Sequence, residues 1–159
     1  MKGQLTHFDV TGSAHMVVIS EKKITARIAI GKCRVSMSDS TLKLVQDKKS
    51  KKGDIIAVAR IAGIMAAKKT FEIIPLCHPI SISKVNIEFL ILPSLNEIEI
   101  TATIKTLGRT GVEMEALTAT TVSALTIYDM LKSVDKRIKI MDVHLVFKDG
   151  GKSGKFEST

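Results

Sequence analysis

The amino-acid sequence predicts an α+β fold, a ferredoxin-like sandwich in which an antiparallel sheet carries two main helices on one face. Alternating apolar residues mark four strands, and apolar residues at helical spacing mark two longer segments. These elements follow one another as strand, helix, strand, strand, helix and strand. The 159 residues predict one domain, 1–159, and we expect its ends, about 1–15 and 150–159, to be mobile.

The first strand is expected over residues 24–35, where apolar residues recur at every second position. One face of this strand carries Ile24, Ala26, Ile28 and Ile30. The first helix is expected after Asp54, whose carboxylate can accept a hydrogen bond from a backbone N–H of the first turn. This helix, over 55–69, is rich in small residues, so it can approach its neighbours closely. The side chains in register on it are Ala57, Ile61 and Met65.

Two strands joined by a tight turn are expected next. Residues 85–91 alternate apolar and polar side chains, and residues 98–104 repeat the pattern. The apolar positions are Val85, Ile87, Phe89 and Ile91 in the first strand and Ile98, Ile100, Ala102 and Ile104 in the second. A Pro-Ser-Leu-Asn turn over 93–96 separates them, so we expect an antiparallel hairpin.

The second helix is expected over residues 116–134, and it is apolar on two opposite sides. One side holds Leu117, Ala124, Ile127, Leu131 and Val134; the other holds Val122, Leu125, Asp129 and Lys132. A helix that is apolar all round is covered on both sides, whereas one small domain supplies one sheet face. We therefore infer that a second chain or a lid covers the other side. The last strand is expected to bury Val143, Leu145 and Phe147.

Composition excludes several classes of protein. The net charge of +8 suits an anionic partner, but five Phe, one Tyr and no Trp leave few aromatic side chains for stacking on bases, which argues against nucleic acid. No apolar run reaches the roughly 18 residues that a membrane span needs. The two cysteines and the absence of an apolar leader predict a protein of the reducing cytoplasm.

Cys77 and His78 lie between two prolines in a short stretch, IIPLCHPI, that is otherwise apolar. They could be metal ligands, a nucleophile with its base, or core residues. No second Cys or His stands nearby, so a zinc site is weakly supported and no metal is expected. Adjacent side chains diverge, so a Cys77 nucleophile would need another base. The remaining interpretation makes His78 an acid, base or phosphate donor and leaves Cys77 as packing.

Four charged residues near the second helix form two further candidates. Glu113 and Glu115 would share one face of an extended segment, and paired carboxylates separate their pKa values into an acid and a base. Alternatively, they are acids that favour the start of a helix. Asp129 and Lys132 are helical neighbours in an apolar row. They are either a surface ion pair, worth under ~1 kcal/mol, or part of a functional site.

Two basic segments could meet an anion. Lys52 stands just before the first helix, a position that suits anion binding. The GGKSG segment at 150–154 lacks the earlier glycine and the following helix of a phosphate-binding P-loop. It either lays backbone amides and Lys152 near an anion or is a disordered tail.

Five motifs taken together resemble one family, the cyclic pyranopterin monophosphate synthases of molybdenum cofactor biosynthesis. They are KKGDIIAVARIAGIMAAKKT, IIPLCHPI, TGVEMEALTA, LTIYDMLK and GGKSG, and the likeness extends from LTH at 5–7 to nearly the end of the chain. In one departure, the chain has MVVIS where the family has Met-Val-Asp-Val-Ser. Val18 therefore replaces an acid.

The resemblance implies an enzyme, a lyase. Its substrate would be 3′,8-cyclo-7,8-dihydro-GTP, which it would convert to cyclic pyranopterin monophosphate with release of pyrophosphate. It also implies a ferredoxin-like homohexamer, a trimer of dimers with active sites at the dimer interface. No cofactor is implied to be required, and Mg²⁺ is compatible with the triphosphate.

The resemblance also assigns residues. It implies catalytic roles for Asp129, Lys132, His78, Glu113, Glu115 and Lys52. It implies substrate binding by Leu76, Cys77, His78, Glu113, Met114, Arg27 and Lys148. The alternative is a basic module that binds a nucleotide or RNA without chemistry. Three carboxylates near the phosphates would repel such a ligand, so the acids favour the enzyme.

Overall fold

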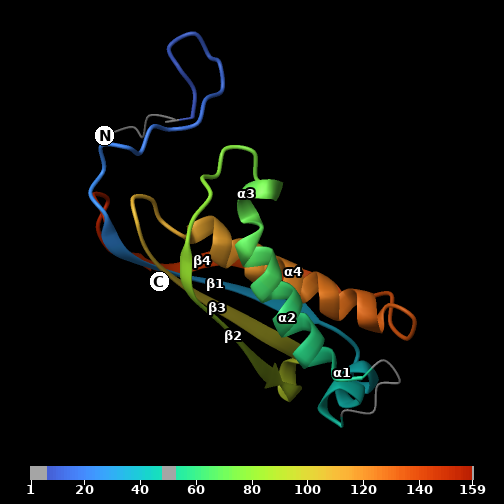
Figure 1. Cartoon of the computed structure of the whole chain (residues 1–159). Coiled ribbons are helices and arrows are strands. Elements are labelled where there is room, and N and C mark those ends of the chain that lie inside the picture. The colour runs from blue at the N-terminus through green and yellow to red at the C-terminus, as the bar shows by residue number, and fades with distance from the viewer. Residues whose placement is uncertain (1–6, 48–52, 159) are drawn as a thin grey trace.

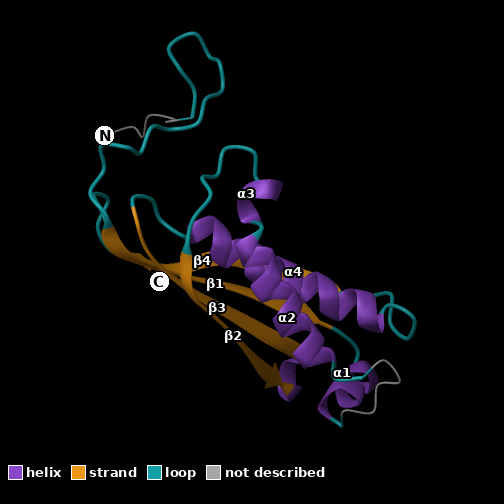
Figure 2. Cartoon of the chain, in the orientation of Figure 1, coloured by secondary structure: helices purple, strands orange, loops and turns teal. Residues whose placement is uncertain are grey.

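The computed structural model describes residues 7–47 and 53–158 and confirms the α+β fold (Figure 1). Its elements, in chain order, are β1 (Thr25–Ser36), α1 (Asp39–Gln46), α2 (Ile55–Lys68), α3 (Thr70–Ile73), β2 (Ile82–Leu92), a 3₁₀ turn (Pro93–Leu95), β3 (Glu97–Gly108), α4 (Glu113–Leu131), β4 (Lys139–Asp149) and β5 (Phe156–Glu157). The sheet has the order β2-β3-β1-β4-β5, with every pair antiparallel. Helices α2 and α4 lie on one face of it (Figure 2). The sequence did not predict α1, α3 or β5.

The hairpin is confirmed. Strands β2 and β3 pair antiparallel, with Val85 opposite Ile104 and Phe89 opposite Ile100. All four apolar side chains predicted for β3 are fully buried, because this strand lies inside the sheet and under the helices. Asn96 closes the turn with a positive φ of 54°, a conformation that asparagine tolerates better than most residues.

Strand β1 faces the helices with the side opposite to the one singled out in the sequence. Ile28 and Ile30 do share a face, but the residues buried under α4 are the small ones on the other side of the strand: Ala29, Gly31, Cys33 and Val35. The physical reason is the close approach of α4. A Cβ on Gly31 would stand 3.0 Å from the carbonyl oxygen of Ala116, so a larger residue there would push the helix away.

Strand β4 differs from the prediction because it is irregular. Its register against β1 shifts twice, once between Ile30 and Gly31 and once between Lys32 and Arg34. Leu145 pairs with Gly31 and packs against the core. Phe147 pairs with Ile30, which places it on the opposite face of the sheet. The prediction that Val143, Leu145 and Phe147 share one buried face was therefore wrong. Val143 is 43 % exposed.

Helix α2 is capped as predicted, since Asp54 Oδ1 accepts a hydrogen bond from the backbone N–H of Ala57 at 3.0 Å. It contacts α4 through small residues. The row of side chains predicted to be in register does not make this contact, since Ile61 and Met65 are more than half exposed. At Gly63 an added Cβ would stand 2.9 Å from the carbonyl oxygen of Ala119, so glycine permits the close approach of the two helices.

Helix α4 begins and ends about three residues earlier than predicted. The sheet and α2 cover much of it, including Ala116, Ala124 and Ile127, which are fully buried. Its outer row is open within this single chain, and Leu125 is 54 % exposed. The inferred cover, from a second chain or a lid, therefore stays a prediction. In the part of the chain that the structure describes, no helix is long and apolar enough to cross a membrane.

Candidate active site

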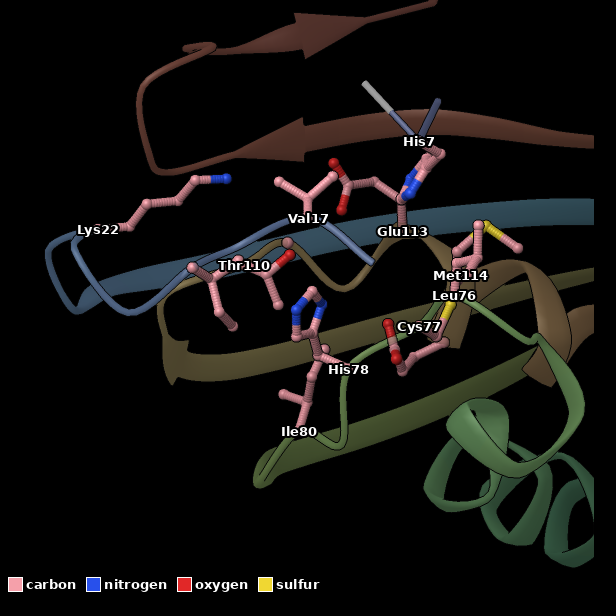
Figure 3. A pocket seen from close by; sticks show the side chains of 13 residues that line it. His7, Val17, Lys22, Leu76, Cys77, His78, Ile80, Thr110, Glu113 and Met114 are labelled. Carbon is pink, nitrogen blue, oxygen red and sulfur yellow. The ribbon is translucent and has the colours of Figure 1, made fainter. Parts of the chain in front are cut away.

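A pocket of about 280 Å³ lies at the end of the sheet where β1 begins and β3 and β4 end (Figure 3). Three segments build it: the stretch before β1, the loop between α3 and β2, and the loop between β3 and α4 together with the first turn of α4. Its walls are formed by His7, Val17, Ile19, Lys22, Leu76, Cys77, His78, Ile80, Thr110, Gly111, Glu113, Met114 and Glu115. Six residues that the sequence assigned to the site are therefore brought together: Leu76, Cys77, His78, Glu113, Met114 and Glu115.

The loop between the prolines holds His78 and Cys77 in different environments. The backbone N–H of Cys77 donates to the carbonyl of Ile74 at 3.1 Å, which makes the loop turn. The His78 ring points into the pocket, while Cys77 lies beside Leu76 (Figure 3). Burial, and then the charge of Glu115, raises the pKa of the Cys77 thiol, so the thiolate needed by a nucleophile is disfavoured. This supports the interpretation of Cys77 as packing.

Glu113 and Glu115 occupy the first turn of α4 rather than an extended segment. Their side chains are thus not parallel as on a strand, yet both reach the pocket wall. Glu115 is only 3 % exposed. Burial, followed by the negative charge of Glu113, raises its pKa to about 7, and a hydrogen bond with its own backbone opposes this. A carboxyl with such a pKa can both give and take a proton near neutral pH.

Two cations lie on β4 and β1, near the strand ends that border the pocket. Lys148, on β4, places its Nζ atom 3.0 Å from Oε1 of Glu113. Arg27, on β1, donates from Nε to the carbonyl of Gly108 and from Nη1 to that of Gly150, both at 3.3 Å. Pairing of β1 with β3 and β4 therefore brings both cations to the end of the sheet where the pocket lies.

Asp129 and Lys132 lie elsewhere in the chain. Lys132 Nζ is 2.6 Å from Asp129 Oδ1, and this hydrogen bond and charge raise the pKa of Lys132. Sixteen residues of helix separate Asp129 from Glu113, which corresponds to roughly 24 Å at 1.5 Å per residue. One chain does not bring this pair to His78. Lys52 lies outside the described residues.

Sequence reasoning missed several pocket residues, of which His7, Lys22 and Thr110 are polar. Each comes from a loop without periodicity, and no spacing links them to one another. The adjacent basic residues Lys22 and Lys23 were the one local signal available. Among the described residues, no group of three or more His, Cys, Asp and Glu side chains could hold a metal ion.

The family model described as the MoaC family matches residues 16–151. The chain belongs to the MoaC family. Three relatives, each called cyclic pyranopterin monophosphate synthase, match at nearly full length. The protein of Dinoroseobacter shibae is 56 % identical over 97 % of this chain and 98 % of its own, and that of Clostridium perfringens is 54 % identical over 98 % and 99 %. The protein of Chloroflexus aurantiacus is 51 % identical over 97 % and 94 %.

These matches confirm the resemblance drawn from the five motifs. The part of the chain that matches the family model includes every described residue assigned to the site, from Arg27 to Lys148.

Proposed function

We propose that the chain is a cyclic pyranopterin monophosphate synthase, a lyase of molybdenum cofactor biosynthesis. It would convert 3′,8-cyclo-7,8-dihydro-GTP to cyclic pyranopterin monophosphate and release pyrophosphate. Relatives of that name, 51–56 % identical over nearly the whole chain, support this activity. The observation that carries it in the structure is the meeting of His78 with two carboxyls, Glu113 and Glu115, in one pocket.

The groups around the pocket suit the chemistry. Ring opening and closure require several proton transfers, and such groups work best when their pKa lies near the operating pH. Glu115, with a pKa of about 7, meets that condition, and His78 is the second candidate because its ring faces the same space. Loss of pyrophosphate is favoured when cations neutralise its charge, a role for Arg27 and Lys148.

The active site in this proposal is shared between two chains of a homohexamer built as a trimer of dimers. Asp129 and Lys132, with Lys52, would reach the pocket of a partner copy. Two observations support this: the pair lies too far along α4 to join His78 of its own chain, and the outer helical surface exposes Ile61, Met65 and Leu125. Large exposed apolar patches mark association surfaces.

A complementation experiment tests the sharing. His78→Ala and Asp129→Asn variants, each inactive alone, are unfolded together, refolded as a mixture and assayed. Random pairing at a two-fold interface would restore one intact site in each mixed dimer, or about a quarter of all sites. If the mixture stays inactive while assembling normally, the sites are not shared in this way. Light scattering that finds an active monomer would also contradict the proposal.

We propose further that the protein acts in the cytoplasm, takes a small nucleotide-derived substrate rather than nucleic acid or a membrane, and needs no cofactor of its own. Cys33 and Cys77 are both free thiols, which suits a reducing compartment. Mg²⁺ could accompany the triphosphate. Turnover measured with and without a chelator separates a metal carried by the substrate from no metal at all.

The direct test is incubation with 3′,8-cyclo-7,8-dihydro-GTP, followed by measurement of pyrophosphate and of the pterin product. The proposal predicts both products in equal amounts. Tight binding without pyrophosphate would instead indicate the alternative, a non-catalytic binding module. The names of the relatives give that alternative no support.

A further inference from the structure

A second imidazole, that of His7, belongs to the pocket that holds His78. Both residues line the pocket, and in Figure 3 their rings extend toward the same space from different sides. His78 comes from the loop between α3 and β2, whereas His7 comes from the segment that precedes β1. His7 lies before the part of the chain that matches the family model, residues 16–151, and the resemblance implies no role for it.

His7 stands at the base of a small N-terminal hairpin, residues 7–15. The carbonyl of His7 accepts a hydrogen bond from the backbone N–H of His15 at 2.9 Å, and Phe8 pairs with Ala14 in an antiparallel bridge. Every residue of this hairpin is exposed, and Figure 1 shows it in blue, standing away from the sheet and the helices. The hydrophobic core therefore does not order this segment.

The turn of the N-terminal hairpin is instead stabilised by one of its own side chains. Asp9 Oδ1 accepts hydrogen bonds from the backbone N–H groups of Thr11 at 2.8 Å and Ser13 at 2.9 Å, and from the Thr11 hydroxyl at 2.6 Å. Gly12 has a φ of 83°, a conformation that glycine adopts at little cost. An Asp side chain that bonds to the following backbone favours such a turn. The closed turn limits the positions that the backbone of His7 can take.

Two apolar residues after the hairpin attach it to the pocket. Val17 and Ile19 are partly buried and line the pocket together with His7. Met16 and Val18 alternate with them and are 47 % and 73 % exposed. Alternation of this kind is typical of a segment that sets one face against the protein. The segment thus keeps the base of the hairpin beside the pocket while the turn remains in solvent.

The groups that share the pocket with His7 can carry charge or exchange protons. They are His78 from the loop before β2, Glu113 and Glu115 from α4, and Lys22 from the stretch before β1. Imidazole is the side chain that most often transfers protons near neutral pH. A substrate ring bound in this pocket would therefore meet one imidazole from the loop before β2 and another from the N-terminal hairpin.

We propose that His7 is a further catalytic residue, which contacts the bound nucleotide and moves a proton on its ring system. This inference rests on the proposed function. The neutral imidazole of His7 accepts a proton from the substrate and becomes an imidazolium. It then returns that proton to another atom of the same substrate as the new ring closes, so the step needs no co-reactant. The N-terminal hairpin holds the imidazole beside the pocket during both transfers.

Single-turnover pyrophosphate release distinguishes proton transfer by His7 from mere contact. Glutamine can still form hydrogen bonds but cannot carry a proton near neutral pH, whereas alanine does neither. We expect His7→Gln and His7→Ala both to lose about 10²-fold or more, the low end of the effect of general acids and bases. Free imidazole should restore part of the activity of His7→Ala. Near-native turnover in His7→Gln would overturn the proposal.

His15→Gln is the matched control. It removes an imidazole from the other limb of the same hairpin, and His15 does not line the pocket. Its turnover should stay within about twofold of wild type, as for most substitutions at exposed positions. The thermal unfolding of all three variants should match that of the wild type, because residues 7 and 15 are both exposed. Equal losses of turnover in His7→Gln and His15→Gln would show that only the integrity of the hairpin matters, and the proposal would fail.

A second measurement requires no turnover. Diethyl pyrocarbonate modifies accessible imidazoles, and mass spectrometry of the full chain measures the modification of each one. Bound 3′,8-cyclo-7,8-dihydro-GTP should suppress the modification of His7 and leave that of His15 unchanged. If the nucleotide binds and His7 stays as reactive as His15, the proposal is wrong at whatever rate pyrophosphate appears.

The two measurements also distinguish this proposal from the proposed function. If the wild type releases pyrophosphate while His7→Gln turns over normally, the proposed function stands and the role of His7 fails. If the wild type releases none and the nucleotide still protects His7, the proposed function fails, and the contact between His7 and the nucleotide stands.

Discussion

Lys148 Nζ lies 3.0 Å from Glu113 Oε1, and this ion pair joins the end of β4 to the first turn of α4. Each side chain of the pair is 29 % exposed, so the contact is neither fully solvated nor sealed in the core. It sets a cation beside the carboxyl whose negative charge helps to raise the pKa of the neighbouring Glu115. Strand β4 and helix α4 thus meet at Glu113, two residues before the buried Glu115.

The first prediction removes this cation. Lys148→Met keeps the apolar stem, and we expect the free energy of unfolding to change by less than about 1 kcal/mol, as for a partly exposed pair. Pyrophosphate release should fall by about tenfold or more, because a charged hydrogen bond at the pocket edge is lost. Lys155→Met is the control, since Lys155 pairs with Glu157 at 2.7 Å but does not line the pocket. Equal losses in the two variants would contradict a role for Lys148.

The second prediction concerns pH and the buried acid. Folding raises the pKa of Glu115 from 4.5 to about 7, so the folded state holds its proton more tightly. Its contribution to stability is complete below pH 4.5 and is lost as the pH rises through 7, by up to roughly 3 kcal/mol. Glu115→Gln has no such proton, so its unfolding free energy should decline less over that range. Urea unfolding at pH 4.5 and pH 8 measures the difference.

A companion variant separates the two causes of this raised pKa. Burial is the larger cause and the charge of Glu113 the smaller. In Glu113→Gln the pKa of Glu115 should therefore drop somewhat but stay above 4.5, and the fall of stability should move to slightly lower pH. An unchanged profile in both Glu113→Gln and Glu115→Gln would show that another group titrates.

The third prediction concerns the contact between α2 and α4. Gly63→Ala should destabilise the protein by about 1–3 kcal/mol through overpacking, although alanine is the better helix former. An added methyl would meet the Ser123 hydroxyl, Ile87 and the carbonyl of Ala119. Thermal unfolding of Gly63→Ala, with and without Ser123→Ala, checks the cause. The second substitution should restore part of the loss, because it removes one of the three clashing groups; a stability gain in Gly63→Ala alone would refute the tight contact.

The fourth prediction concerns Asp129, for which the family resemblance implies catalysis. Asn keeps the size of the side chain and can accept the hydrogen bond from Lys132, but it cannot carry a proton near neutral pH. We expect Asp129→Asn to assemble normally, to bind the nucleotide and to lose at least ~10²-fold in single-turnover pyrophosphate release, the low end of the effect of general acids and bases. Near-native turnover would leave Asp129 as an ion-pair partner of Lys132, and the proton transfer would pass to Glu113 or His78.

The sequence by itself determined the elements whose signals are local. Alternation predicted the hairpin of β2 and β3, and Asp54 marked the start of α2 because an N-cap acts within one turn. The IIPLCHPI stretch made His78 a candidate site residue, since prolines on both sides of a titratable side chain are visible without any tertiary contact. The structure places His78 on the pocket wall. The short α1 and α3, of eight and four residues, were missed, although Ser38 caps α1 by accepting a hydrogen bond from the backbone N–H of Thr41.

Only the tertiary structure decided features that depend on distant partners. Strand β1 is apolar on both faces, so alternation cannot say which face α4 covers; the close approach of Ala116 to Gly31 decides it. The two register shifts in β4 move Phe147 off the core face, and pairing across the sheet carries Lys148 to Glu113. Glu115 is buried in the folded chain, and that burial raises its pKa. Local periodicity records which side chains share a face, whereas packing against distant segments determines what that face meets.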